Sequence, residues 1–232
     1  MNMKILKKLA AVCTVCLMAA CGGKEETIPV IMIDPGHDMN YPGETGLVTE
    51  NEYTAALGAA VAANLQEKGG AEVLLTHEAE QNMAAEKRLT LIAEKQPAAV
   101  ISLHARAGTW DDGGRIRIAL PKPGTEIYAD SLRLAQAFAE QFADRTVEIG
   151  TYYYIPTRPN AYAMEFHDQS ETEALEYETL VLPQSCTSPV IVVEMLNVNN
   201  SDDVNALAGE EGISASAEKI TAAVRKYTGS AD

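Results

Sequence analysis

The stretch VIMIDPGH, residues Val30 to His37, decides the fold of this chain. Its short apolar run predicts a buried strand, and the stretch ends in a histidine. AVISLH at residues 99–104 has the same form, and a third run, Val190 to Val193, is followed by Glu194. Because helix-like segments separate these runs, the sequence predicts an α/β fold with a largely parallel sheet. Ligands gather at the carboxyl ends of such strands, so we expect the two histidines and Glu194 to meet at one edge.

The first residues form a targeting segment. A lysine-containing start precedes an apolar stretch, Leu9 to Ala20, which is too short to span a bilayer. Its end, LMAAC at residues 17–21, resembles a bacterial lipobox, and this resemblance implies a lipid on Cys21. Ordinary secretion with cleavage elsewhere is the alternative. We expect a signal peptide at residues 1–20, the lipidated cysteine and a short tether at 21–28, and one folded domain at 29–229.

Composition limits the partners of the chain. Its 232 residues, 47% of them hydrophobic, are enough for one buried core. The formal net charge of -15 excludes nucleic acid as a partner, because nucleic-acid binding needs a basic surface. Membrane attachment would therefore depend on the lipid on Cys21. With Cys21 lipidated, only Cys186 remains in the folded part, so we expect a buried structural thiol and no disulfide framework.

Periodicity predicts the remaining elements. We expect further strands at 73–75, 98–103 and 115–120, and helices at 52–68, 84–95, 131–142 and 213–227. The loop at 34–49 is long enough to be functional. The segment 147–188 is the least regular, and we interpret its run of acidic residues as a solvated face.

Two of the four histidines suggest a metal site. Catalytic zinc takes three protein ligands drawn from histidine, carboxylate and sometimes cysteine. His37 and His104 each follow a predicted strand, and a carboxylate near His37 would complete the set. Glu50 and Glu52 both lie close to the start of the next helix, where either would also suit the helix dipole. Spacing alone does not choose between them.

Four motifs follow one another along the chain: IDPGH at 33–37, Glu52 with Leu57 five residues later, SLHA at 102–105, and PVIVVE at 189–194 with Asn200 six residues later. In this order they resemble the zinc-dependent N-acetylmuramoyl-L-alanine amidases of the amidase 3 family. Thr76 and Arg88 fit the same pattern, and the similarity runs from about Pro29 to Tyr227.

The resemblance implies a three-layer α/β/α fold with a mostly parallel twisted sheet. It implies Zn²⁺ held by His37, Glu52 and His104, with Glu194 as the catalytic carboxylate. Glu52 is selected over Glu50 because the family's glutamate precedes a helix leucine by five residues. The activity so implied is cleavage of the amide bond between N-acetylmuramic acid and L-alanine of the peptidoglycan stem peptide, with residues 29–229 as the catalytic domain.

Two further positions are candidates for substrate binding, Asn200 and Arg106. Arg106 stands where the family usually has asparagine, so it could contact a stem-peptide carboxylate or the developing oxyanion. A surface salt bridge is the alternative role. In some relatives an inserted element covers the zinc until a protein activator removes that element. We hypothesise that Glu165 or His167 covers the zinc in this chain.

The expected location is the bacterial envelope outside the cytoplasm, with a lipid anchor in the membrane and peptidoglycan as substrate. Two other functions stay open. One is a non-catalytic lipoprotein that binds wall peptides or a partner. The other is a zinc hydrolase of a different amide or peptide.

Overall fold

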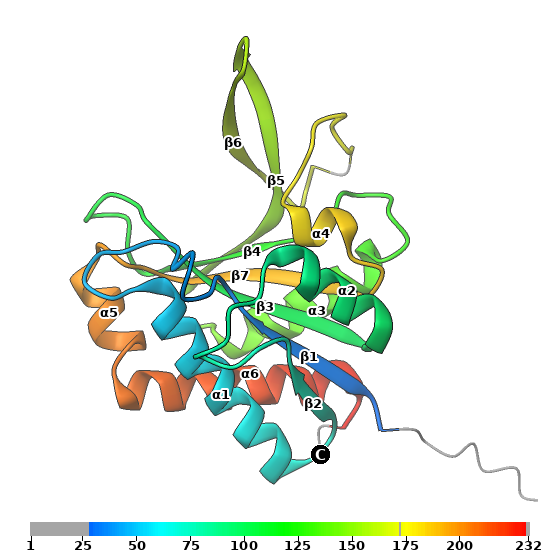
Figure 1. Cartoon of the computed structure of the whole chain (residues 1–232), viewed down its shortest axis with the longest axis vertical. Helices are drawn as coiled ribbons and strands as arrows, with labels where there is room; N and C mark the ends of the chain where they lie inside the picture. Colours follow the sequence, from blue (N-terminus) through cyan, green and yellow to red (C-terminus); the bar gives the residue numbers. More distant parts are fainter. Residues whose placement is uncertain (1–27, 172, 231–232) are drawn as a thin grey trace, which may run out of the picture.

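A mixed β-sheet of seven strands lies between two helical layers in the computed structural model, which describes residues 28–171 and 173–230 (Figure 1). The expected signal peptide, Cys21 and all but the last residue of the tether lie outside these residues. No described helix is long and apolar enough to cross a membrane.

The strands are β1 (Val30–Pro35), β2 (Glu72–Leu75), β3 (Ala99–Arg106), β4 (Arg115–Ala119), β5 (Thr146–Arg158), β6 (Ala161–Asp168) and β7 (Val190–Asn197). The helices are α1 (Glu50–Lys68), α2 (Ala85–Lys95), α3 (Tyr128–Gln141), α4 (Val181–Ser185), α5 (Ser201–Leu207) and α6 (Glu210–Thr228).

The strand order is β2-β1-β3-β7-β4-β5-β6. Strands β2, β1, β3 and β7 are mutually parallel, β4 runs antiparallel to β7, β5 is parallel to β4, and β6 returns antiparallel along β5. The expected three-layer fold with a mostly parallel sheet is confirmed. Its parallel half brings the carboxyl ends of β1, β3 and β7 to one edge, where ligands bind in sheets of this kind.

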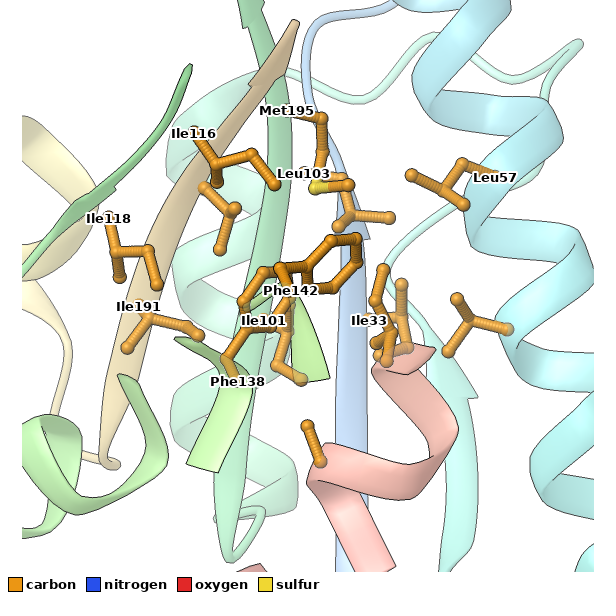
Figure 2. Packing of buried hydrophobic residues seen from close by; sticks show 14 of the residues in the cluster. Ile33, Leu57, Ile101, Leu103, Ile116, Ile118, Phe138, Phe142, Ile191 and Met195 are labelled. Atoms are coloured by element: carbon orange, nitrogen blue, oxygen red, sulfur yellow. The ribbon is translucent and has the colours of Figure 1, made fainter. Parts of the chain in front are cut away.

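Alternation along the parallel strands builds the main core. Ile33 of β1, Ile101 and Leu103 of β3, and Ile191 of β7 are fully buried on the face that packs against α1, α3 and α6. Figure 2 shows these side chains converging with Phe138 and Phe142, whose stacked rings lie 4.7 Å apart. This face is apolar along the length of the strands and fixes their register.

The opposite sheet face changes from apolar to polar along each strand. At its apolar end, Met32, Val100 and Val190 pack against Ile92 of α2. Towards the carboxyl ends the same rows of side chains continue with polar residues, because every second residue of a strand shares a face. These residues are Asp34 of β1, Ser102 and His104 of β3, and Glu194 of β7.

Asp34 connects four segments at that polar end. Its Oδ1 accepts a hydrogen bond from Thr76 Oγ1 at 2.7 Å, and its Oδ2 accepts one from Ser102 Oγ at 2.7 Å. Arg88 of α2 donates from Nη1 to Oδ1 at 3.2 Å. The side chain is 1% exposed, so these bonds compensate for burying the carboxylate.

The segment expected to be irregular, 147–188, contains a β-hairpin. Strand β5 pairs with β4 through Gly150 and then with β6, and the outer part of this β5–β6 hairpin stands out from the body of the molecule (Figure 1). Consecutive tyrosines at 152–154 hide the two-residue alternation that signals a strand. The expected irregularity is therefore wrong for residues 147–168, whereas the interpretation of the acidic run as a solvated face is confirmed, because its carboxylates at 165, 168, 171, 173, 176 and 178 are all exposed.

We predict that Asp34→Ala lowers the free energy of unfolding by about 3–5 kcal/mol, because it leaves the Arg88 guanidinium without its buried partner. Urea unfolding followed by circular dichroism measures the change.

The matched control is Asp130→Ala. Asp130 pairs with Arg133 on the surface of α3, with a side chain 56% exposed, and its replacement should change stability by less than about 1 kcal/mol. Similar losses in both variants would contradict a special role for Asp34.

Candidate metal and catalytic site

His37 lies in a tight turn directly after β1. The Gly36 amide donates to the Leu103 carbonyl at 2.7 Å, and a Cβ at Gly36 would lie 2.6 Å from the His104 ring. Only glycine therefore allows the two histidine-bearing segments to approach this closely. His37 itself has a φ of 66°, a left-handed conformation that is rare for residues other than glycine.

Glu50, the first residue of α1, lies between the two histidines. Its Oε1 is 2.9 Å from His104 Nδ1, and its Oε2 is 3.3 Å from His37 Nε2. Backbone amides hold the same carboxylate, because Ala105 N donates to Oε1 at 2.9 Å and Glu44 N donates to Oε2 at 2.8 Å. One nitrogen of each imidazole and a Glu50 oxygen all lie within 4.8 Å of one another.

Glu52 does not join this cluster, so its selection as the third member is wrong. It lines a separate surface pocket together with Leu47 and Ile213. The reason is helical phase. Seven residues separate Glu50 from the buried Leu57 and bring both to one helix face, whereas five residues place Glu52 about 140° away. The spacing from Glu50 to Leu57 was the signal available in the sequence.

The buried environment changes the acidity of the cluster. Burial by itself would favour the neutral form of Glu50, but hydrogen bonds from His104 and His37 outweigh it and hold the pKa of Glu50 well below its usual range. The contact with Glu50 raises the pKa of His37, against the opposing effect of burial. Glu50 is thus a carboxylate at neutral pH, as a cation ligand must be.

Glu194 occupies the neighbouring strand at the same level. The β3–β7 register pairs it with His104, and the β4–β7 register pairs it with Arg117. The Tyr152 hydroxyl donates to Glu194 Oε2 at 2.8 Å. Burial raises the pKa of Glu194, and the Tyr152 hydrogen bond and nearby positive charges only partly offset this. The expected meeting of His37, His104 and Glu194 at one sheet edge is confirmed.

A cavity of about 580 Å³ opens over these side chains. One part of its lining is polar and includes His37, Glu50, His104 and Glu194. The other part is apolar and comes from the hairpin and the segment around α4, with Tyr154, Met164, Leu180, Val181 and Leu182.

Arg106 borders this cavity, but its guanidinium is already engaged. Both Nη atoms donate to the Asp112 carbonyl at 3.0 Å, and Nη2 also reaches the Arg115 carbonyl at 3.4 Å. The side chain is 7% exposed. Arg106 thus holds the loop that follows β3, and a contact with substrate would require breaking these bonds.

Asn200 is a helix cap, and the structure places it outside the cavity that holds His37, His104 and Glu194. Its Oδ1 accepts from the Asp203 amide at 2.8 Å at the start of α5, and its Nδ2 donates to the Trp110 carbonyl. It lines a different surface pocket beside Asp111 and Asp202. A cap three residues before an aspartate is a common pattern, so the local sequence already contained this alternative.

Glu165 and His167 do not cover the cluster, contrary to the hypothesis from the sequence. Alternation along β6 places Met164 at the cavity and Phe166 against Tyr152, so the two intervening polar residues belong to the other face of the hairpin. The His167 ring instead packs against Tyr153, and its Nδ1 lies 2.8 Å from Glu171.

The fold matches solved amidase structures. The catalytic domain of CwlV from Bacillus (Paenibacillus) polymyxa var. colistinus superposes with a TM-score of 0.67 and 18% identity, over 88% of this chain and 100% of that one. AmiC2 of Nostoc punctiforme gives 0.61 and 19%, over 86% and 96%. CwlD of Clostridioides difficile, solved with the GerS lipoprotein, gives 0.65 and 16%, over 86% and 98%.

Sequence comparison leads to the same group of proteins. No curated protein sequence matches the chain. The family model described as N-acetylmuramoyl-L-alanine amidase, Amidase_3, however, matches residues 31–226, which include every strand and helix of the site except the first residue of β1. The chain therefore belongs to the amidase 3 family of N-acetylmuramoyl-L-alanine amidases.

Proposed function

We propose that this protein is a zinc-dependent amidase that hydrolyses the bond between N-acetylmuramic acid and L-alanine of the peptidoglycan stem peptide. The observation that carries the proposal is the grouping of His37, Glu50 and His104 beside Glu194, at one cavity of an amidase 3 fold.

The residues present fit a zinc ion. Two imidazoles and one carboxylate are a donor set found in catalytic zinc sites, which leave a further position for water or substrate. The potential ligand atoms of His37, Glu50 and His104 lie within 4.8 Å of one another, and the Glu50 carboxylate is held by two backbone amides. When bound there, zinc would polarise the scissile carbonyl as a Lewis acid.

Glu194 supplies the proton transfer in this proposal. Its carboxylate takes a proton from the attacking water and then gives it to the nitrogen of L-alanine as the C–N bond breaks. Burial raises the pKa of Glu194, which makes its protonated form easier to reach. The same group can therefore accept a proton from water and later donate it to the leaving nitrogen. The products are a free lactyl carboxylate and a free amine.

The shape of the cavity supports a substrate with two unlike halves. Its polar part is lined by the residues proposed to cleave the amide, and its apolar part includes Tyr154 and Met164 of the hairpin. Peptidoglycan joins a sugar and a peptide at the bond to be cut, so a cavity with one polar and one apolar part suits it.

Envelope location belongs to the same proposal. A lipid on Cys21 would hold the domain outside the cytoplasm, and residues 21–28 would form the short tether between lipid and domain. A protein partner is also part of it, supported by the CwlD structure, in which that amidase is bound to the lipoprotein GerS. Among the described residues, the exposed Met164 of the hairpin lines the cavity, where a partner would affect access, and the exposed Tyr162 is two residues away on the same face of β6.

Digestion of purified peptidoglycan by the mature protein tests the activity. We expect release of intact stem peptides with a free L-alanine amine, lost on treatment with chelator and restored by zinc. Glu194→Gln should lower kcat by about 100- to 10,000-fold, because it removes the group that transfers the proton.

Other outcomes identify the rival functions. Binding of wall material without release, even with added zinc, would indicate a non-catalytic lipoprotein. Zinc-dependent cleavage of another amide, with the muramoyl bond intact, would indicate a hydrolase of different specificity.

The zinc ligands are tested by a pair of variants on one helix. Glu50→Gln should weaken zinc binding by about 100-fold or more, since it removes the anionic member of the donor set. Glu52→Gln, two residues away on an exposed face, should leave zinc affinity within about twofold. Competition with a chromophoric chelator measures both affinities, and a loss confined to Glu52→Gln would reverse the assignment.

A further inference from the structure

Tyr152 is a buried phenol aimed at Glu194. Its hydroxyl donates to Glu194 Oε2 at 2.8 Å, while its side chain is only 5% exposed. The ring packs with Ala119 and Val192 and makes an edge contact with Phe166 at 4.9 Å. Contacts on β4, β6 and β7 thus fix the direction of the hydroxyl.

Arg117 also faces Glu194 across the β4–β7 pair, but its guanidinium is bound elsewhere. Its Nε donates to Glu148 Oε2 at 2.7 Å, and Arg115 binds the other oxygen of Glu148 at 2.9 Å. Glu148 thus pairs with the guanidinium that the sheet register places opposite Glu194, and the Arg117 charge offsets only part of the rise in the Glu194 pKa that burial causes. A direct ion pair with Arg117 would have stabilised the Glu194 carboxylate and opposed its protonation.

From this arrangement we infer that Tyr152 is a positioning residue for the amidase reaction, which holds Glu194 Oε2 so that Oε1 carries the transferred proton. The inference rests on the proposed role of Glu194. A neutral donor suits this task because it fixes the carboxylate without adding a charge beside it. Burial and the nearby Glu194 charge also raise the pKa of Tyr152, so the phenol keeps its proton at neutral pH.

The substitution Tyr152→Phe removes the hydroxyl and keeps the ring. We expect kcat on a soluble muropeptide to fall by about 10- to 100-fold, as for loss of a hydrogen bond to a charged group. KM and zinc content should stay within about twofold, because the altered contact serves the chemical step.

Tyr153→Phe is the matched control, one residue along β5 on the opposite face. Its hydroxyl accepts from the Leu175 amide at 3.4 Å and has no contact with Glu194. We expect a kcat within about twofold of the parent value. Equal losses in the two variants, or an unchanged kcat in Tyr152→Phe, would overturn the inference.

A double-mutant cycle separates positioning from a general structural effect. In a Glu194→Gln background, Tyr152→Phe should lower kcat by less than about twofold, since the carboxylate that Tyr152 orients is already absent. If Tyr152→Phe lowers kcat in that background as much as in the parent protein, Tyr152 does not act through Glu194. If Glu194→Gln alone leaves kcat unchanged, the proposed function fails instead, so the two failures are distinguishable.

A fluorinated tyrosine at position 152 covers the case in which Tyr152→Phe does not fold. It keeps the ring packing but ionises at lower pH than tyrosine. A fall in kcat as this phenol ionises, absent from the parent protein, supports the inference. An unchanged kcat across that ionisation overturns it.

Discussion

The burial of one carboxylate organises the site. Glu50 is 1% exposed, and an unpaired carboxylate in such a position would cost several kcal/mol. Its oxygens are satisfied by two histidines and by the amides of Glu44 and Ala105, which come from the loop after β1 and from β3. The loop must therefore close tightly, and a Cβ at Gly43 would lie 2.3 Å from Glu50 Oε2.

The change of strand direction around β7 divides the site into two sides. Towards the parallel neighbour β3, Glu194 faces His104, which belongs to the group with His37 and Glu50. Towards the antiparallel neighbour β4 it faces Arg117, with Tyr152 contributed by β5. One carboxylate thus lies between a side that holds the group of His37, Glu50 and His104 and a side that holds Tyr152 and the Glu148-paired Arg117.

Much of this architecture could be predicted from the sequence. The short apolar runs that end in His37, His104 and Glu194 are buried strands, because parallel strands covered on both faces must be apolar. Glu52 was selected on its five-residue spacing to Leu57, but the helix begins at Glu50, and a shift of two residues turns a side chain through more than half a turn. Helix starts are the element boundaries that propensity specifies least well.

The β5–β6 hairpin and the contact of Tyr152 with Glu194 could not be predicted from sequence patterns, for a different reason. Both faces of β5 carry tyrosines, and Pro156 interrupts the run, so neither alternation nor composition indicates a strand. The partner of Tyr152 is 42 residues away in sequence. Only the order of strands in the sheet brings the two together, and no local signal specifies that order.

The β5–β6 hairpin is a part of the domain where substitutions can change the cavity without changing the core. It is anchored in the sheet through Gly150, while its outer part is open to solvent: Met164, which lines the cavity, is 49% exposed, and Tyr162, on the same face of β6, is 65% exposed. Substitutions there change the wall of the cavity and leave the core against α1, α3 and α6 untouched. Selection on substrate range can thus act on this ribbon with little loss of folding stability, while the reaction chemistry stays fixed in the sheet.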